Sequence, residues 1–462
     1  MLLDINRYSL SVFMREIAAL TKLAWPMMLA QIAAIGTGFV DTVMAGAAGK
    51  DDLAAVALGS SVFATTYVTF LGIMTALNPL IAQLFGAGKL PEVGQTGRQG
   101  LWFGCFLGLA GMALLLLLIQ PFMWYLDLPD KVESMFGQYV FFVALAMPAA
   151  MVHRALHAYA ASLNRPKPMM WVSWAALLLN IPLNYIFVYG KFGMPALGGA
   201  GCGLATMLVF WFNATALWIY IKKNHYFQKF ALFERFDKPD WTRLKQIWKL
   251  GWPIGFSYFL EVSLFSFIVF LIAKFGADQV AAQQVVISLT GIIYMIPQAL
   301  GAASMVRVGF ALGKGWTQKA RYISGVSLVF GCALAVFTML FLVFMRYPLA
   351  NMYTDDAAII AIAVQVLLFS AFFQFFDFTQ CIASYALRGY KITKAPMLIH
   401  GLAFWGVGLL PGYYLANAQG LEIFGFWWAL IVSLAAAATL LVWFLEKHSK
   451  IIAQQKVFKT ND

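Results

Sequence analysis

Residues 22–55, KLAWPMMLAQIAAIGTGFVDTVMAGAAGKDDLAA, decide the fold, because the same pattern returns 227 residues later. The second copy, residues 249–282, reads KLGWPIGFSYFLEVSLFSFIVFLIAKFGADQVAA, and eight positions are identical without a gap. The identical pairs are Lys22/Lys249, Leu23/Leu250, Trp25/Trp252, Pro26/Pro253, Gly49/Gly276, Asp51/Asp278, Ala54/Ala281 and Ala55/Ala282. Both copies lie in long apolar stretches, so the sequence predicts two related membrane bundles joined in one chain.

The composition of the chain excludes a soluble protein. Hydrophobic residues make up 62 % and charged residues 11 % of the 462 residues, and the mean hydropathy is +0.77. In soluble domains, charged residues make up about 25 % of the chain. Runs long and apolar enough to cross a bilayer are predicted at twelve places: 23–45, 53–82, 97–119, 137–161, 169–190, 200–221, 249–272, 280–304, 319–344, 357–385, 395–415 and 424–445.

The twelve spans divide into two lobes of six. Residues 1–221 form the predicted amino-terminal lobe, residues 222–248 a basic cytoplasmic linker, and residues 249–462 the carboxyl-terminal lobe with a short tail. Because six is an even number, both lobes start on the same side, and a pseudo-two-fold axis along the membrane normal relates them. The predicted fold class is an all-α polytopic membrane protein. The repeated Pro26 and Pro253 are either tolerated kinks near helix starts or hinges that bend during transport.

The Lys and Arg residues predict the orientation of the chain. Of these 32 residues, 26 lie on the side of the two termini and five on the opposite side, so both termini are expected in the cytoplasm. The formal net charge of +12 therefore reflects topology. No nucleic-acid partner is expected, since no loop is long enough to form a binding domain. Residues 1–20, with Asp4, Arg7 and Glu16, are expected to form a lead-in helix at the membrane interface rather than a cleaved signal peptide.

Three carboxylates within the predicted spans are the strongest candidates for chemistry. Asp41, Glu261 and Asp377 have no basic residue within one turn on their own helix, and ionisable residues in spans usually serve function. At a rise of 1.5 Å per residue, Glu261 and Asp377 lie about 16 and 12 Å from the cytoplasmic ends. This similar depth predicts that the two acids share one monovalent cation or proton. A carboxylate in a low-dielectric cavity seeks such neutralisation, which predicts exchange of an inward-moving ion for an outward-moving cationic substrate.

Polar residues at helical spacing are predicted near these acids. Ser61 belongs to one such stripe and Gln284 to another, and each stripe either lines a water-filled cavity or joins neighbouring helices. For the stripe around Asp377 a cavity is expected. That stripe consists of Ser370, Gln374, Asp377, Cys381 and Ser384.

Aromatic and acidic residues near the spans add three further candidates. Phe265 and Tyr294 either face the substrate, because aromatic rings attract organic cations, or belong to the core. Asp356 is either a helix N-cap or part of a charged vestibule for incoming cations.

Other polar residues near the spans have structural interpretations. Asp51 and Asp278, at the start of their spans, are predicted to be helix N-caps rather than ion sites. His400, five residues into its span, is expected at the membrane interface. Arg154 is expected within a span, and the spans offer little arginine beyond it. A flippase of lipid-linked sugars would need cavity arginines for pyrophosphate, so this alternative is disfavoured.

Several segments resemble one known family. They are FVDTVMAG (39–46), SLNRP (162–166), LNIPLNYIFVYGKFGMPALGGAGCG (179–203), the Glu of YFLEVSLF (258–265) and DFTQCIASYALRGY (377–390). The chain resembles the MATE (multidrug and toxic compound extrusion) family over almost its whole length, and within it the NorM-type members. The resemblance implies a twelve-helix, two-lobed exporter of organic cations, with Asp41 as the amino-lobe acid and Glu261 and Asp377 as the carboxyl-lobe cation pair. Some members have a Tyr one turn before the second of these acids, where this chain has Phe373.

The residues and the resemblance together predict a secondary active multidrug efflux antiporter and not an enzyme. It is expected to export amphipathic organic cations in exchange for Na⁺ or H⁺, with Glu261 and Asp377 binding the coupling ion. The residues expected to handle substrate or protons are Asp41, Ser61, Gln284, Tyr294, Asp356 and Phe265. No cofactor other than the coupling ion is expected. The expected partners are cationic drugs and dyes and the lipid of the bacterial inner membrane, with the chain acting as a monomer. A channel or sensor without coupled transport is the alternative of another class.

Overall fold

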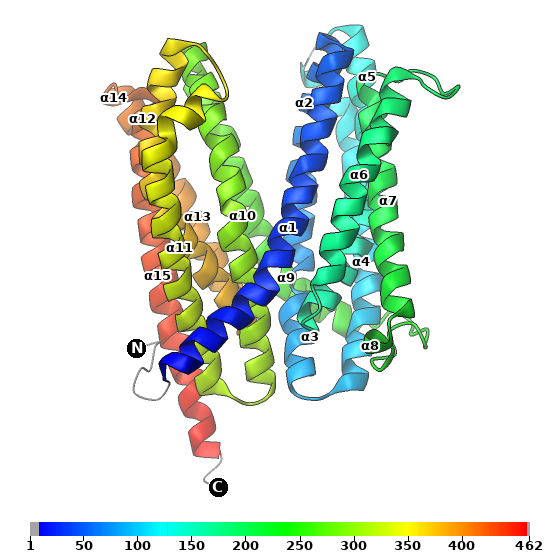
Figure 1. Cartoon of the computed structure of the whole chain (residues 1–462), viewed down its shortest axis with the longest axis vertical. Helices are drawn as coiled ribbons and strands as arrows, with labels where there is room; N and C mark the ends of the chain where they lie inside the picture. Colours follow the sequence, from blue (N-terminus) through cyan, green and yellow to red (C-terminus); the bar gives the residue numbers. More distant parts are fainter. Residues whose placement is uncertain (1–8, 127, 460–462) are drawn as a thin grey trace. The chain divides into compact units, whose positions relative to one another are not determined.

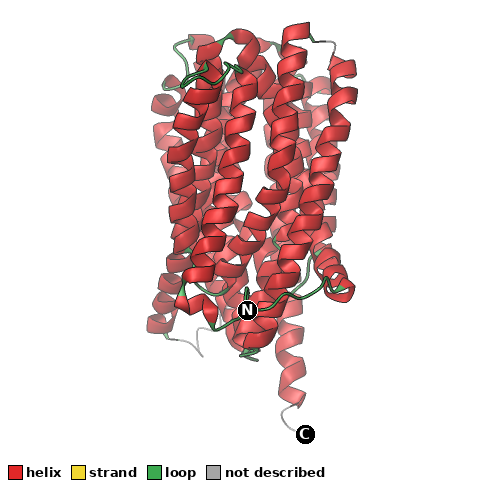
Figure 2. Cartoon of the chain, turned by 90° about the vertical axis from the view of Figure 1, so that its right-hand side faces the viewer, coloured by secondary structure: helices red, strands yellow, loops and turns green. Residues whose placement is uncertain are grey.

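The computed structural model describes residues 9–126 and 128–459, which are helical almost throughout and contain no strand (Figure 1, Figure 2). Twelve helical stretches are long and apolar enough to cross a membrane, and each overlaps one of the twelve predicted spans. A helix satisfies its own backbone hydrogen bonds, which lipid cannot do. The predicted all-α polytopic fold is confirmed.

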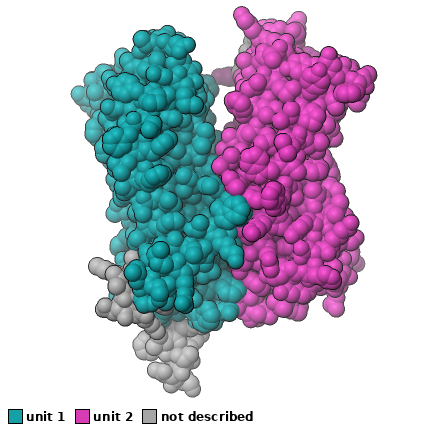
Figure 3. All heavy atoms as spheres, in the orientation of Figure 1, with its two compact units in different colours: residues 1–28, 256–462 teal, residues 29–255 magenta. Residues whose placement is uncertain are grey.

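Two compact units make up the chain (Figure 3). Unit 2 covers residues 29–255, and unit 1 covers residues 256–462 together with the described part of 1–28. The helices of unit 2 are α2 (Lys50–Met74), α3 (Leu77–Gly86), α4 (Leu90–Leu126), α5 (Asp130–Ser162), α6 (Lys167–Tyr189), α7 (Gly199–Lys223) and α8 (His225–Gln228). Those of unit 1 are α10 (Ala277–Gly313), α11 (Thr317–Asn351), α12 (Ala357–Gly389), α13 (Lys394–Gly401), a π-helix (Leu402–Leu409), α14 (Leu410–Ala418) and α15 (Glu422–Lys459).

Two helices contribute to both units. These are α1 (Leu10–Ala48) and α9 (Trp241–Ile272). A 3₁₀ turn, Ala273–Phe275, extends α9. The division falls after Met28 in α1 and after Gly255 in α9, and these positions match in the 227-residue register. Each lies two residues after a repeated proline. The predicted lobe boundaries at 221 and 249 are the end of the sixth span and the start of the seventh, and they stay a prediction.

Glycines allow neighbouring helices to approach closely within each unit. In unit 2, α5 packs against α4, and a Cβ atom added to Gly108 would lie 2.5 Å from the Cα atom of Pro148. In unit 1, α10 packs against α12, and a Cβ atom added to Gly301 would lie 2.9 Å from the ring of Tyr385. Small residues at such crossings are typical of membrane helices, where close packing replaces the hydrophobic effect as the source of association.

Two predictions about helix starts are wrong. Asp51 and Asp278 lie in the first turns of α2 and α10, while the N-cap positions are Gly49 and Gly276. Gly276 has a φ of 120°, a conformation that favours glycine over any residue with a side chain. The aspartates therefore complement the helix dipole from inside the helix instead of capping it.

The lead-in segment is helical from Leu10, as predicted, and its place at the membrane interface stays a prediction. Asp4 and Arg7 lie outside the described residues, and from Leu10 onward the segment is the first part of the continuous helix α1. Glu16 is buried in unit 1, where its Oε1 atom lies 2.5 Å from Nε of Arg307 on α10. This part of α1 is therefore anchored to protein through an ion pair.

Candidate functional site

Asp41, on α1, is the centre of a closed polar site within unit 2. Its side chain is 5 % exposed. One carboxylate oxygen, Oδ1, accepts hydrogen bonds from the amides of Asn180 at 3.0 Å and Asn184 at 2.6 Å. The other, Oδ2, accepts one from the Thr206 hydroxyl at 2.7 Å. Both oxygens of this buried acid are therefore supplied with donors, as the cost of burying an ionisable group requires.

Two helices position these donors. Asn180 and Asn184 lie one turn apart on α6, and the amide of Asn184 also donates to the Asn180 oxygen at 3.0 Å. From α7, Thr206 reaches the carboxylate and Cys202, one turn earlier, contacts the backbone oxygen of Asp41 at 3.5 Å. The one-turn spacing of the two Asn residues is visible in the sequence. The α7 partners are not, because nothing in their spacing shows which helix they face.

Glu261 and Asp377 come together within unit 1, as their predicted depth suggested. Glu261 lies on α9 and Asp377 on α12, and the rings of Phe265 and Phe373, one turn from the respective acids, are in contact with centroids 6.4 Å apart. The Tyr294 hydroxyl, from α10, lies within hydrogen-bonding reach of Glu261. In the described part of the chain, neither acid forms an ion pair with a Lys, Arg or His side chain. Asp377 is 5 % exposed and Glu261 is half-buried, and two neighbouring acids without an ion-pair partner favour uptake of a cation or a proton.

A hydrogen-bonded chain leads away from Asp377. The Gln380 amide nitrogen donates to Oδ1 of Asp377 at 3.0 Å, and the Gln380 oxygen lies 2.9 Å from Nε2 of His400 on α13. Because that oxygen can only accept, His400 donates through Nε2. His400 is 4 % exposed and stacks on Phe404 with centroids 5.1 Å apart. The hydrogen bond and the ring contact hold it in the interior of unit 1, and its position at the depth of the membrane interface stays a prediction.

Arg388 is a buried cation that sequence reasoning placed outside the spans. The apolar run ends near residue 385, but α12 continues to Gly389 and Arg388 is 3 % exposed. Its guanidinium donates to the Tyr258 hydroxyl at 3.1 Å and to Ser384 at 3.3 Å, and lies over the Tyr385 ring at 4.3 Å. These contacts shield the charge from the apolar surroundings. Arg388 therefore lies within a membrane-spanning helical stretch, as Arg154 does.

The polar stripe on α12 packs inside unit 1. Ser370 and Gln374 are 0 % exposed, Cys381 2 % and Ser384 1 %. A side chain beside water-filled space would retain accessible surface, so the predicted water-filled cavity along this stripe is wrong. The tight packing of α12 against α10, α11 and α15 leaves these groups in contact with protein.

The remaining candidates have different surroundings. Ser61 and Gln284 are exposed within their units, and the Ser61 hydroxyl donates to the Ala57 oxygen of its own helix at 2.8 Å. The Phe265 ring packs in the core of unit 1 against Phe373, with centroids 6.4 Å apart.

Asp356 is the exposed N-cap of α12, as one of its two interpretations predicted. Its Oδ1 accepts hydrogen bonds from the backbone N–H groups of Ala358 at 2.8 Å and Ile359 at 3.5 Å. The cap explains why an acid stands here, and it leaves a vestibule role as a separate prediction.

Comparisons with known proteins match both halves of the chain. The MatE family model matches residues 26–186 and again residues 253–414, which supports the internal repeat. A probable multidrug resistance protein NorM from Neisseria meningitidis serogroup A is 67 % identical over 450 residues, covering 97 % of this chain and 98 % of the relative. A protein of the same name from Chromobacterium violaceum is 47 % identical over 97 % of this chain and 98 % of its own length.

A solved structure agrees with these relatives. The MATE transporter NorM-NG, in complex with a dye and a monobody, is 62 % identical and superposes with a TM-score of 0.80, covering 93 % of this chain and 94 % of that chain. The family model, the identity and the fold thus point the same way and confirm the expected NorM-type resemblance. The chain belongs to the MATE family of membrane transporters, and it is not an enzyme.

Proposed function

We propose that this chain is a multidrug efflux antiporter that exports amphipathic organic cations in exchange for Na⁺ or H⁺. The relatives named as multidrug resistance proteins and the complex of NorM-NG with a dye support the substrate class. The observation that carries the exchange mechanism is the Glu261–Asp377 pair, one half-buried and one buried acid without an ion-pair partner among the described residues.

The pair has the chemistry of a coupling site. Carboxylate oxygens are suitable ligands for Na⁺, a hard cation, and either acid also accepts a proton. With both acids ionised, their mutual repulsion in a low-dielectric place favours uptake of one positive charge. Occupancy then follows the Na⁺ or H⁺ gradient across the membrane, and release of the ion on the opposite side leaves the pair ready for another cycle.

Asp41 has a different part in this proposal. Its three side-chain donors stabilise the ionised carboxylate, so a fixed negative charge lies in unit 2 where an organic cation is attracted to it. Tyr294 orients Glu261. The exposed side chains of Ser61 and Gln284 contact the substrate, Phe265 supports the pair through Phe373, and Asp356 attracts cations at the start of α12.

A reconstitution experiment tests the proposal. Purified protein in liposomes is given first a Na⁺ gradient and then a pH gradient, and movement of the cationic dye ethidium is recorded by fluorescence. We expect one gradient to drive dye movement, and Glu261→Gln and Asp377→Asn to reduce it to the level of empty liposomes. Glu92→Gln is the matched control, because Glu92 is an exposed acid paired with Lys89 at 3.0 Å. Gradient-driven movement at the wild-type rate in either pair variant would exclude the pair from coupling.

The membrane and the orientation are part of the same proposal. Twelve apolar stretches and the family make this a multi-pass membrane protein, and the excess of Lys and Arg on one side supports an inner-membrane location with both termini in the cytoplasm. A fluorescent protein fused to the carboxyl terminus should fold and fluoresce, while a fused alkaline phosphatase should stay inactive. The opposite pattern would reverse the orientation.

A further inference from the structure

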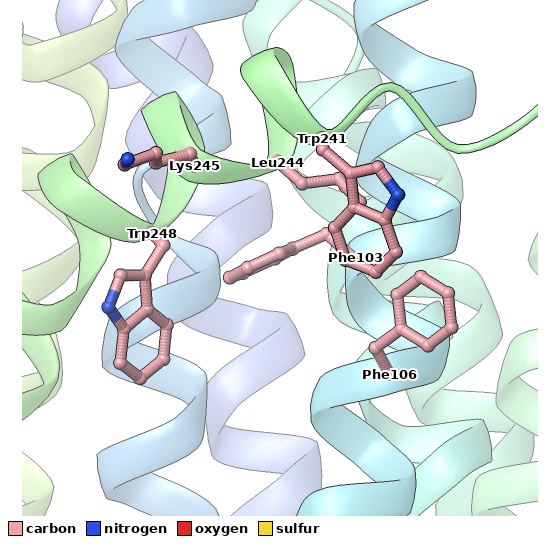
Figure 4. Close-up of a pocket in the computed structure, with 6 residues that line it drawn as sticks. All are labelled: Phe103, Phe106, Trp241, Leu244, Lys245 and Trp248. Carbon is pink, nitrogen blue, oxygen red and sulfur yellow. The ribbon is translucent and has the colours of Figure 1, made fainter.

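An aromatic groove lies between α4 and the start of α9 in unit 2. It has a volume of about 520 Å³ and is lined by Phe103, Phe106, Trp241, Leu244, Lys245 and Trp248 (Figure 4). Phe103 and Leu244 are 7 % and 5 % exposed, whereas Trp241 is 73 % and Trp248 47 % exposed. The groove therefore has a buried apolar floor and an open aromatic rim, in the size range of small-molecule sites.

The segment before α9 is tied to α4, which fixes the shape of the groove. Nε of Arg98 lies 2.5 Å from Oδ2 of Asp237, and the same guanidinium donates to the backbone oxygen of Ala231. The side chain of Gln99 donates to the Lys238 oxygen at 2.9 Å and accepts from the Asp240 N–H at 2.8 Å. These bonds hold the segment directly before α9 against α4, so the groove is preformed.

Stacked rings form one wall of the groove. The Trp241 and Phe106 rings are nearly parallel, with an interplanar angle of 12° and centroids 5.9 Å apart, and Phe106 stacks in turn on Trp102. The Trp102 indole N–H donates to the Asp237 oxygen at 2.9 Å. In Figure 4, Phe103 lies between Trp248 on one side and the Trp241–Phe106 wall on the other. Trp241 and Trp248 directly precede the span predicted to begin at residue 249, and tryptophan is enriched where spans meet the headgroups of a bilayer.

Lys245 gives the groove a positive charge at its rim. Among the described residues it forms no ion pair, whereas the neighbouring Arg243 lies 3.5 Å from Asp240. No acid lines the groove. An organic cation would meet a like charge here, while a phosphate group would meet an opposite one above an apolar floor.

We propose that this groove binds an anionic phospholipid, with an acyl chain against Phe103 and Leu244 and the headgroup phosphate at Lys245. Basic pockets between membrane helices at the cytoplasmic side bind such headgroups, and apolar side chains exposed on a span contact lipid tails. The lipid would brace the tied segment before α9 against α4. The proposal does not depend on transport or on the coupling ion.

Photo-crosslinking tests the lipid site. The full chain is reconstituted in phosphatidylcholine liposomes with a trace of photoactivatable phosphatidylglycerol or, separately, photoactivatable phosphatidylcholine, and labelled peptides are mapped. We expect the phosphatidylglycerol probe to label peptides covering 98–108 and 241–248 more strongly than the phosphatidylcholine probe does. Lys245→Gln should lower that yield about fivefold, as the loss of one lysine near an anionic headgroup implies, and Lys245→Arg should restore it.

Lys249→Gln is the matched control, since Lys249 is exposed one turn further along α9 and does not line the groove. Its yield should equal that of the wild type. Equal labelling by the two probes, or an unchanged yield in Lys245→Gln, would overturn the proposal. Because both changed lysines are exposed, folding is expected to survive, and ethidium transport in the same liposomes reports on the proposed function independently.

Discussion

The acid of unit 2 and the acids of unit 1 are held in opposite ways. Asp41 is a single carboxylate whose two oxygens accept three side-chain hydrogen bonds from α6 and α7. Asp377 accepts a side-chain bond from Gln380 and shares its surroundings with a second acid, Glu261. A carboxylate whose oxygens all accept hydrogen bonds is stabilised in its charged form by those donors. Two neighbouring carboxylates with fewer donors need a bound cation or proton instead. We infer that the two units have divided the work, with a fixed charge in one and an exchangeable site in the other.

The internal repeat copies the scaffold and not the acids. In the 227-residue register Asp41 aligns with Ile268, seven residues after Glu261. Glu261 aligns with Ala34, seven residues before Asp41. Seven residues make about two turns, so both acids lie on the same face of matching helices but at different positions along it. Ile268 is 0 % exposed and belongs to the core of unit 1, which shows that the position of one acid became a packing position in the other half.

The largest expected effect is on ion-dependent stability. A bound coupling ion raises the free energy of unfolding, by about 2.7 kcal/mol at one hundred times its Kd. We expect Na⁺ or acid to raise the thermal midpoint of the detergent-purified wild type, and Glu261→Gln and Asp377→Asn to abolish that rise. Asp41→Asn should keep the rise and lose dye transport. The measurement is a thermal unfolding series over Na⁺ at fixed pH and over pH at fixed ionic strength.

Loss of the ion-dependent rise in Asp41→Asn as well would contradict a division of work between the two units, because the exchangeable ion would then involve unit 2. Unchanged stabilisation in both Glu261→Gln and Asp377→Asn would equally contradict the division of work.

A second test concerns the hydrogen bonds that the Asp41 carboxylate accepts. Thr206→Val keeps the shape of the side chain and removes the donor to Oδ2, so a buried charged acceptor is left one bond short. We expect a loss of about 2 kcal/mol in the free energy of unfolding, the usual cost for a bond to a charged group. Thr215→Val on the same helix is the control. The Thr215 hydroxyl is exposed and bonds its own helix at Trp211, so this change should stay within about 0.5 kcal/mol. Equal losses in the two variants would mean that Asp41 does not depend on Thr206.

The sequence predicts the spans and the duplication well, for a physical reason. Lipid requires helices of a minimum apolar length, so twelve apolar runs identify twelve helical stretches, and the matching Trp–Pro pairs identify the two halves. The in-span acids were also visible, because a charge in an apolar run is rare. Both signals depend only on the chain itself.

The partners of the acids could not be predicted, because they depend on which helix faces meet. Thr206 is an ordinary residue of an apolar helix until the fold brings its hydroxyl to Asp41 on α1. Arg388 looked like a loop residue because hydropathy ends a span where the charge begins, whereas Tyr258 and Tyr385 allow α12 to continue past it. The hydrogen bond between His400 and Gln380 is likewise invisible in the sequence, because it depends on how α13 meets α12. Hydropathy alone therefore underestimates the polar network around buried sites.

A smaller effect is expected for the chain leading from Asp377. His400→Phe keeps a ring to stack on Phe404 and removes the hydrogen bond to Gln380, so the Gln380 amide is held less firmly. We expect a loss of about 1 kcal/mol in the free energy of unfolding, typical of one neutral hydrogen bond. The ion concentration at half-maximal thermal stabilisation should shift upward. His448→Phe is the control, since His448 stacks on Phe444 far along the chain from the acids, and it should leave that concentration unchanged. If the His400 variant kept the wild-type ion dependence, the hydrogen bond between His400 and Gln380 would have a structural role alone.

The smallest effect separates the two interpretations of Asp356. Serine caps a helix about as well as aspartate, while alanine costs about 1 kcal/mol. Asp356→Ser therefore keeps the cap of α12 and removes the charge, and Asp356→Ala removes both. If Asp356 only caps the helix, Asp356→Ser matches the wild type in thermal midpoint and dye transport, and Asp356→Ala lowers the midpoint alone. A vestibule role predicts instead that Asp356→Ser keeps the midpoint but slows transport at low ionic strength, with recovery in high salt, because the attraction of an exposed charge for a distant cation is screened by salt. The second outcome would place a third acid of unit 1 in the transport cycle and widen the contrast with the single acid of unit 2.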